Sequence, residues 1–338
     1  MQYRYIGRSG LRVSPICMGT MTFGTQCDEK EAFAIMDKAY DAGVNFFDTA
    51  ELYPIPPDAR LAGITEQMVG RWLKTKPRES VILATKVAGA ASGWFVPPIR
   101  HGYTAIDRFH IERAVEGSLK RLGTDYIDLY QMHWPDTVVP VEESMRAFDA
   151  LVQSGKVRYI GTSNDTARGT MKSLMVSKYE KLARFESIQN NFSLLNRRDL
   201  TEISHLCREE KISLLPYSPL AGGVLSGKYN QSPDAKGRFS DYRKSPNQRQ
   251  RVMADRFMND KTLASTQEYL RIAHETGIHP VTMAIAWSKQ FDFVASTIIG
   301  ATSAAQLDAT LAAMNVTLSD EILKKLDDVH AKILYPMG

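Results

Sequence analysis

The segment IERAVEGSLKRLGTDYIDLYQMH, residues 111–133, carries the pattern that decides the fold. In its first half, apolar residues recur at the spacing that places them on one face of a helix. They are Ile111, Val115, Leu119 and Leu122. Gly123 follows, at a point where helices commonly end in a left-handed residue. The second half, Ile127–His133, is a short run of large apolar residues, which is typical of a strand buried on both faces.

The same unit of helix and buried strand recurs along the chain. Alternation of this kind predicts a parallel sheet with helices outside it. Eight units without a break in composition favour an α/β fold of the closed (β/α)8 type, a TIM barrel, with residues 1–338 as one domain. The eight strand-like runs are Pro15–Gly19, Val44–Thr49, Val81–Val87, Ile127–His133, Val157–Ser163, Phe185–Asn190, Ile212–Ser218 and Val294–Ala301.

Smaller elements and long loops complete the predicted barrel. Tyr3–Gly7 and Leu11–Ser14 flank Arg8-Ser9-Gly10 and predict an N-terminal hairpin that plugs the barrel floor. Ser319–Val329 predicts one extra helix at the C-terminus. The long loops follow strands, so we expect them at the C-terminal rim, where such barrels keep their active sites. These loops are Leu52–Gly63, Ala88–Arg108 and Ala221–Asp260, the last being polar and basic.

Composition and charge exclude several classes of function. The net charge is only +4 and the basic residues are scattered, so we expect no nucleic-acid partner. Cys17, Cys27 and Cys207 fit no metal-binding spacing and are expected to be free thiols. No apolar stretch is long enough to cross a membrane, and no signal region opens the chain, so the expected location is the cytoplasm. The sequence indicates no particular oligomeric state.

Polar residues stand at the ends of consecutive predicted strands. Asp48 ends the second strand, with Tyr53 five residues later, while Lys86 and His133 end the third and fourth. A closed barrel would bring these side chains together at one rim. Taken singly, each has a structural alternative: a helix cap, a loop aromatic, a solvated strand end or a core histidine. Taken together, they predict a site that donates a proton.

The four side chains suit the protonation of a carbonyl oxygen. A phenol has a pKa of about 10 and is a poor acid at neutral pH, but a nearby ammonium lowers that pKa. We therefore expect Lys86 to activate Tyr53, with Asp48 holding Lys86 charged and in place. His133 can donate a hydrogen bond to the substrate oxygen. Such a device does not itself reduce a carbonyl, so a hydride-carrying cofactor is required.

Several motifs, in this order and at this spacing, resemble those of one family. They are residues 5–14 (YIGRSGLRVS), 18–24 (MGTMTFG), 45–53 (NFFDTAELY), 85–86 (TK), 118–129 (SLKRLGTDYIDL), 160–164 (IGTSN), 217–220 (YSPL) and 299–303 (IGATS). Over nearly the whole chain, the sequence resembles the aldo-keto reductase superfamily and, within it, the bacterial Tas-like reductases. The resemblance implies a (β/α)8 barrel that reduces aldehydes or ketones with NADPH or NADH.

The resemblance also implies roles for individual residues. Asp48, Tyr53, Lys86 and His133 would be the catalytic tetrad, with Tyr53 as general acid. Ser163, Asn164 and Gln189 would hold the nicotinamide amide, and Tyr217 would stack on its ring. The pyrophosphate would lie along Ser218, Leu220 and Gly222, with Lys228 and Arg238 nearby. The remaining expected cofactor contacts are Gly19, Thr20, Asp48, Pro219, Gly300, Thr302 and Gln306.

The cofactor and the substrate can be specified further. Lys228 and Arg238 stand in the loop expected to fold over the adenosine ribose, so NADPH should bind more tightly than NADH. The sequence departs from its relatives in Pro54–Gly63, which shapes the substrate pocket, and at Ala309 and Thr310 after Gln306, near the adenine. Aromatic residues of the loops predict an apolar pocket wall, with packing under the loops as the alternative. They are Trp94, Phe95, Tyr103 and Trp134.

Other functions are compatible with the pattern. Lys86 could form a Schiff base in a barrel lyase, although Asp48 should keep it protonated. The chain could also be a regulatory barrel that holds a nucleotide with little turnover. A metal hydrolase is disfavoured, because the seven histidines form neither a His-x-His pair nor a His-Glu-x-x-His motif.

Overall fold

The predicted barrel is confirmed in its strand order. The computed structural model describes residues 2–91, 100 and 103–337. Its parallel strands run in the order β10-β3-β4-β5-β6-β7-β8-β9. The two edges meet, since Leu214 pairs in parallel with Val294 and the Ile298 N–H donates to the Pro216 carbonyl at 2.8 Å. The strands are β3 (Ile16–Gly19), β4 (Phe46–Asp48), β5 (Ile82–Val87), β6 (Ile127–Met132), β7 (Val157–Ser163), β8 (Phe185–Gln189), β9 (Ser213–Leu214) and β10 (Thr297–Ile299).

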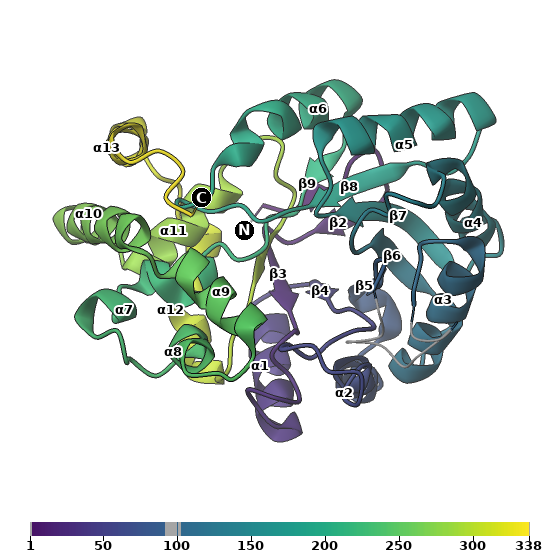
Figure 1. Ribbon diagram of the computed structural model, residues 1–338, viewed down its shortest axis with the longest axis horizontal. Helices are drawn as coiled ribbons and strands as arrows, with labels where there is room; N and C mark the ends of the chain where they lie inside the picture. The colour runs from purple at the N-terminus through teal and green to yellow at the C-terminus, as the bar shows by residue number, and fades with distance from the viewer. Residues whose placement is uncertain (1, 92–99, 101–102, 338) are drawn as a thin grey trace.

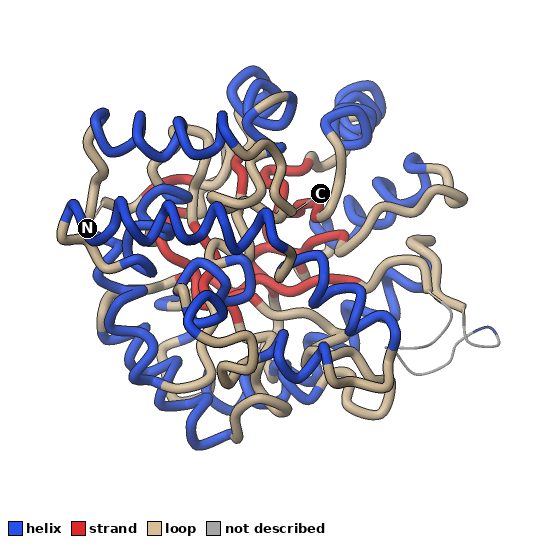
Figure 2. The backbone as a smooth tube through the Cα atoms, turned by 60° about the vertical axis from the view of Figure 1, so that its left-hand side comes forward, coloured by secondary structure: helices blue, strands red, loops and turns tan. Residues whose placement is uncertain are grey.

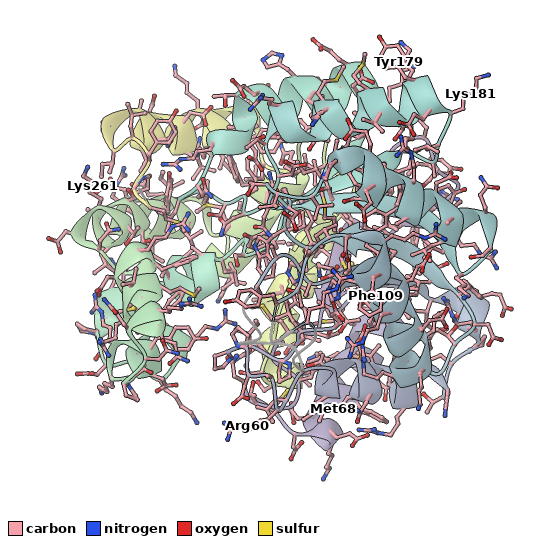
Figure 3. The ribbon with its side chains drawn as sticks, turned by 45° about the vertical axis from the view of Figure 1, so that its right-hand side comes forward. Arg60, Met68, Phe109, Tyr179, Lys181 and Lys261 are labelled. Atoms are coloured by element: carbon pink, nitrogen blue, oxygen red, sulfur yellow. The ribbon has the colours of Figure 1, made fainter. Side chains whose placement is uncertain are left out.

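Helices surround the strands on the outside, as Figures 1 and 2 show. Their apolar faces pack on the sheet and their outer faces are exposed to solvent. Tyr179 and Lys181, at the end of α5, are two such exposed residues (Figure 3). The helices that follow strands or precede them are α1 (Glu29–Asp41), α2 (Ile64–Leu73), α3 (Arg108–Leu122), α4 (Val141–Gln153), α5 (Ala167–Glu180), α6 (Glu202–Glu210), α10 (Asp260–Thr276), α11 (Pro280–Lys289) and α12 (Leu307–Ala312). None of the helices in the described part of the chain is long and apolar enough to cross a membrane.

The helix in the opening segment ends where the sequence predicts. Gly123 caps α3 with a φ of 63°, a left-handed conformation that an L side chain rarely adopts. Four residues later the chain enters β6 at Ile127. At the other end, the Asp107 side chain accepts a hydrogen bond from the His110 N–H and so caps the first turn.

Inside the barrel, side chains alternate with a period of two and form layers. Phe46, Ala84 and Leu129 belong to an apolar layer. Asp48, Lys86 and Gln131 come two residues later on the same strands and form a polar layer above it. Gln189 of β8 joins this layer, because its Nε2 reaches Asp48 Oδ1 at 2.9 Å. All of these polar side chains are at most 3% exposed. The rim of the barrel is thus polar although the strands are buried on both faces.

The N-terminal hairpin closes the opposite end of the barrel, as the sequence predicts. It consists of β1 (Arg4–Tyr5) and β2 (Arg12–Val13), which pair antiparallel. Its turn donates hydrogen bonds to side chains of the barrel: the Arg8 N–H to Glu186 Oε2 at 2.8 Å, and the Gly10 N–H to the Tyr159 hydroxyl at 3.1 Å.

The extra C-terminal helix is α13 (Asp320–Lys332), which begins after Ser319 as predicted and ends slightly later. Arg197 holds it from the loop after β8. The Arg197 guanidinium pairs with Asp327 at 2.6 Å and donates to the Leu326 carbonyl at 2.9 Å. It also lies over the Trp287 ring, 4.6 Å from its centroid.

The segment Ala221–Asp260, expected as a long loop, is not irregular throughout. It folds into short helices, of which η4 and α7 pack against α10 (Figure 1). Its aromatic residues explain the difference, because Phe239 stacks on Phe257 at 4.7 Å and both are buried. Burying these rings stabilises the segment. Its elements are η4 (Ala221–Ser226), α7 (Lys228–Gln231), α8 (Arg238–Arg243) and α9 (Gln248–Phe257), and other short turns are η1 (Arg78–Ser80), η3 (Arg198–Leu200), η5 (Ala304–Gln306) and η6 (Ala313–Asn315).

Candidate active site

Asp48, Lys86 and Tyr53 lie together at the C-terminal rim. Lys86 Nζ is 2.5 Å from Asp48 Oδ2, 2.8 Å from the Thr49 carbonyl and 3.5 Å from the Tyr53 hydroxyl. Lys86 is fully buried, and Tyr53 is 8% exposed. Asp48 and Lys86, at the ends of two strands, therefore form a buried ion pair, and the phenol of Tyr53 lies beside the ammonium.

The turn that carries Tyr53 is held to β5 by Glu51. The Glu51 N–H donates to the Lys86 carbonyl at 3.2 Å, and its carboxylate accepts from the Ala88 N–H at 2.6 Å. The Tyr53 N–H closes the turn on the Ala50 carbonyl at 3.1 Å. The position of the phenol is thus set by the backbone of two neighbouring strands.

Burial dominates the acid–base properties of this group. It raises the pKa of Tyr53, and the charge of Lys86 only partly offsets that effect. The net direction is opposite to the lowering expected from the sequence, because the phenol is almost fully desolvated. Burial by itself would lower the pKa of Lys86, but Asp48 and Tyr53 outweigh it and the net shift is upward. Lys86 is consequently an ammonium at neutral pH.

His133 faces Tyr53 and is uncharged. The two rings meet edge to face with centroids 5.8 Å apart, and His133 stacks on Trp134 at 4.0 Å. Burial, followed by the charge of Lys86, holds the pKa of His133 well below its usual value. A neutral imidazole beside a phenol can donate or accept a hydrogen bond, but it is not a strong acid here.

Four of the expected cofactor residues form one hydrogen-bonded group next to Asp48 and His133. The Tyr217 hydroxyl donates to Asn164 Oδ1 at 2.7 Å, and Asn164 Nδ2 donates to the His133 carbonyl at 2.9 Å. The Ser163 hydroxyl donates to the Gln189 carbonyl at 2.7 Å. Gln189 Nε2 in turn reaches Asp48 Oδ1 at 2.9 Å. The structure thus joins Ser163, Asn164, Gln189 and Tyr217 to the proton-donating side chains.

One buried residue of this group was missed in the sequence. Gln131 is fully buried and its Nε2 donates to Asp48 Oδ1 at 3.1 Å. A signal was present, because Gln131 precedes His133 by two residues on the same strand. Strand residues two apart share a face, so a polar residue at this position in an otherwise apolar run pointed into the site.

Lys228 and Arg238 lie close together, and neither forms an ion pair within the part of the chain that the structure describes, although the charge of Asp241 acts on Lys228. Burial and then the charge of Arg238 lower the pKa of Lys228. None of the ion pairs among residues 2–91, 100 and 103–337 includes Arg238, and its Nε is buried without a hydrogen-bond partner. The Lys228 ammonium donates only to the Lys236 carbonyl, at 3.2 Å, among the hydrogen bonds of the described residues. Two adjacent cations of this kind form a site that fits an anion.

The other expected cofactor residues fall into separate places. Gly19 and Thr20 are packed between strands: a Cβ on Gly19 would lie 2.8 Å from the Ile299 carbonyl oxygen, and the Thr20 hydroxyl donates to the Asp48 carbonyl at 2.9 Å. Gly300 faces open space, and the Thr302 N–H donates to Gln306 Oε1 at 2.9 Å in a turn after β10. The turn that leads from β9 toward Lys228 comprises Ser218, Pro219, Leu220 and Gly222.

The wall around Tyr53 is apolar. Ala50, Leu52, Tyr53 and Ala88 form a cluster with the partly exposed Met21, Ile55, Ala91 and Trp134. Of the aromatic residues expected in this wall, Trp134 belongs to it. Tyr103 is 65% exposed, and Trp94 and Phe95 lie outside the described residues. Among the residues that the structure describes, no cluster of His, Cys, Asp or Glu could hold a metal ion.

The chain is similar to known proteins over nearly its whole length. The model of the aldo/keto reductase family matches residues 15–331. The chain is 37% identical to Protein tas of Escherichia coli, covering 99% of each chain, and 37% identical to the uncharacterized oxidoreductase YrpG of Bacillus subtilis, covering 97% of this chain and 96% of that one. It is also 35% identical to a probable voltage-gated potassium channel subunit beta of Oryza sativa, with 97% and 96% covered. From its motifs, its barrel and these relatives, the chain belongs to the aldo/keto reductase family, and its general role is that of an oxidoreductase.

Proposed function

We propose that this protein reduces aldehydes or ketones to alcohols with NADPH. The observation that carries the proposal is the buried Asp48–Lys86 pair with the Tyr53 hydroxyl 3.5 Å from the ammonium. Bound NADPH would supply a hydride to the carbonyl carbon. Tyr53 would give its proton to the carbonyl oxygen, so that one hydride and one proton yield the alcohol.

The environment of Tyr53 fits a general acid. Because burial raises its pKa, the phenol carries its proton at neutral pH and can release it only as negative charge develops on the carbonyl oxygen. Lys86 would then stabilise the phenolate that remains. Neutral His133 would donate a hydrogen bond to the same oxygen and so orient the carbonyl.

Different groups of surrounding residues would bind different parts of the cofactor. Ser163, Asn164 and Gln189 present amide and hydroxyl groups suited to the nicotinamide carboxamide, and Tyr217 offers a ring for stacking. Lys228 and Arg238, which form no ion pair among the described residues, would bind the phosphates. An anion there would offset two adjacent positive charges, and a 2′-phosphate would add to that effect.

The proposed substrate is a carbonyl compound with an apolar substituent. The reasoning rests on the apolar cluster around Tyr53, which includes Met21, Ile55 and Trp134. Apolar surface removed from water contributes about 25 cal/mol per Å2, so an aromatic or alkyl group should bind here better than a sugar. KM should therefore be lower for aromatic aldehydes than for open-chain sugar aldehydes.

The test is to measure how fast the purified protein reduces a panel of carbonyl compounds. The loss of NADPH absorbance reports the rate. We expect turnover with NADPH, slower turnover with NADH at the same concentration, and lower KM for apolar aldehydes. Borohydride treatment with substrate but no NADPH distinguishes the Schiff-base lyase, since a covalent adduct at Lys86 would favour that reaction.

A second candidate function is a regulatory barrel that binds the nucleotide with little turnover. It is favoured by the similarity to a relative named as a potassium channel subunit beta. NADPH binding with one round of reduction and no steady-state rate would support this role over that of an enzyme.

A further inference from the structure

Gln131 lies between the Asp48 carboxylate and the expected nicotinamide site. It is fully buried in β6, next to Lys86 of β5, with which it is in register. Its Nε2 donates to Asp48 Oδ1 at 3.1 Å, and its Oε1 accepts from Gln189 Nε2 at 3.2 Å. Gln189 Nε2 also reaches Asp48 Oδ1, at 2.9 Å. One amide thus contacts both the acid–base pair and the residue expected to bind the cofactor.

The chemistry of these groups determines the direction of the hydrogen bonds. An ionised carboxylate only accepts hydrogen bonds, so both amides must present their nitrogen atoms to Asp48. Gln131 is then left with its oxygen toward Gln189, and this oxygen can accept only the Gln189 N–H. Gln189 Oε1 takes part in none of the hydrogen bonds found among the described residues, so it is the atom left for a cofactor amide.

The barrel makes room for Gln131 at a specific point. Gly161 of β7 is in register with Gln131, and a Cβ there would lie 3.4 Å from Gln131 Cγ and 2.4 Å from Ser187 Oγ. A Cβ at Gly161 would clash with Ser187 Oγ and reach ordinary van der Waals contact with Gln131 Cγ. The glycine therefore lets the Gln131 and Ser187 side chains lie side by side inside the barrel.

We propose that Gln131 is a positioning residue that couples the Asp48–Lys86 pair to the nicotinamide-binding Gln189. This proposal rests on the proposed function. With Oδ1 held by two amides, Oδ2 stays directed at Lys86 and the ammonium stays beside Tyr53. Without Gln131, the carboxylate loses one of the two donors to Oδ1, and Gln189 loses its acceptor, so both partners gain freedom to rotate.

Two substitutions separate hydrogen bonding from packing. Gln131→Met keeps the volume of the side chain and removes both hydrogen bonds. We expect it to lower kcat about ten- to hundredfold, since hydrogen bonds to charged groups are the stronger kind, with KM for the aldehyde within about threefold of the wild type. Ser187→Ala is the matched control, because it changes a buried side chain that lies near Gln131, on the other side of Gly161, and whose hydroxyl has no partner among the described residues.

Gln131→Glu gives a signature that a merely structural role would not produce. Beside Asp48, the new carboxyl group would have a raised pKa, because two neighbouring carboxylates repel each other. Once protonated, it can donate to Asp48 as the amide does. The rate of Gln131→Glu relative to the wild type should therefore rise as the pH falls, whereas the relative rate of Gln131→Met should not change with pH.

Binding supplies a readout that needs no turnover. Gln131→Met should weaken NADPH severalfold while leaving the affinity for 2′-phospho-ADP-ribose, which lacks the nicotinamide, unchanged. The proposal is overturned if Gln131→Met matches the wild type in rate and in NADPH affinity, or if Ser187→Ala loses as much as Gln131→Met. A wild-type protein that binds NADPH but reduces nothing contradicts the proposed function alone, because the binding comparison still decides the role of Gln131. A wild-type protein that binds no NADPH overturns both.

Discussion

At the scale of single residues, the barrel buries two opposite charges, Lys86 and Asp48, and neither could be buried without the other. Lys86 is fully buried and Asp48 is 2% exposed. Removing one member of such a pair typically costs about 3–5 kcal/mol, because an uncompensated charge remains. Substitution of Lys86 or Asp48 therefore lowers stability as well as activity, and the two effects are hard to separate. The Tyr53 hydroxyl makes only a 3.5 Å contact with Lys86, so it can be removed at a smaller structural cost.

Tyr53→Phe should abolish most carbonyl reduction while NADPH affinity stays near that of the wild type. The proposed role of the hydroxyl is confined to the proton transfer, and general acid catalysis contributes about 10²–10⁴-fold to rate. Steady-state kinetics and a fluorescence titration with NADPH check both parts. Turnover near the wild-type rate would contradict the assignment of Tyr53 as the acid.

The pKa of His133 predicts a loss of stability in mild acid. Its folded-state pKa lies well below 6.5, so below pH 6.5 the unfolded chain binds a proton that the folded chain does not. The full contribution is present above pH 6.5 and is lost as the pH falls. When the pH is lowered from 7 to 5.5, the unfolding free energy of the wild type should fall by about 1 kcal/mol more than that of His133→Asn.

Urea unfolding at the two pH values measures this difference. His205→Asn is the control, because His205 is exposed on α6 and should follow the wild type. If the wild type and His133→Asn lost the same unfolding free energy, His133 would not be held neutral by its surroundings.

At the scale of elements, the alternation of helix and strand was predictable, but the extent of individual strands was not. The apolar run Ile212–Ser218 forms only the short strand β9, Ser213–Leu214. Pro216 explains the shortening, since it has no N–H to donate to a ladder. The chain still follows its neighbour, because the Tyr217 N–H donates to the Asn190 carbonyl at 2.9 Å. Periodicity shows which residues are buried, and the hydrogen-bond partners decide where a strand ends.

The contact between α2 and α3 gives a prediction at this scale. A Cβ on Gly70 of α2 would lie 2.5 Å from the Arg121 carbonyl oxygen and 2.7 Å from Leu122 Cα, both backbone atoms of α3. Gly-to-Ala substitution inside a helix normally stabilises by about 1 kcal/mol. Here the two helices must separate, so Gly70→Ala should instead destabilise by about 1–3 kcal/mol.

Gly117→Ala on α3 is the matched control for that prediction. The three nearest neighbours of the new methyl group would all be guanidinium atoms of Arg121 rather than backbone, with Nη1 at 2.8 Å, while the Arg121 Nε is the atom that pairs with Glu66. The unfolding free energy of Gly117→Ala should equal or exceed that of the wild type. Equal effects of the two substitutions would show that the α2–α3 contact is not limiting.

At the scale of the whole molecule, cofactor binding should appear as added stability. The proposed cofactor residues come from β7, β8, the turn after β9 and the helices α7 and α8, so a ligand there would join several parts of the barrel. At about 100 times its Kd, a ligand adds about 2.7 kcal/mol, which corresponds to about 4 °C in Tm for a chain of this size. NADPH should raise Tm more than NADH at the same concentration.

Lys228 and Arg238 should account for that preference. Lys228→Met and Arg238→Met should each reduce the difference in Tm between the two cofactors, because the 2′-phosphate would lose a charge-assisted hydrogen bond. Equal shifts with NADPH and NADH in the wild type would show that these cations do not bind the 2′-phosphate.

The barrel and the polar residues at the strand ends could be predicted from the order of the amino acids. Helical and strand periodicities are local properties, and a polar residue at the end of an apolar run is visible without coordinates, as for Asp48, Lys86 and His133. Three further features depend on how distant segments pack together in the folded chain. This packing folded Ala221–Asp260 into helices, because Phe239 and Phe257 meet across the segment. It raised the pKa of Tyr53, because desolvation depends on every element around the ring. It brought Gln131 into contact with both Asp48 and Gln189, since contacts among three strands depend on how the strands are staggered in the closed barrel.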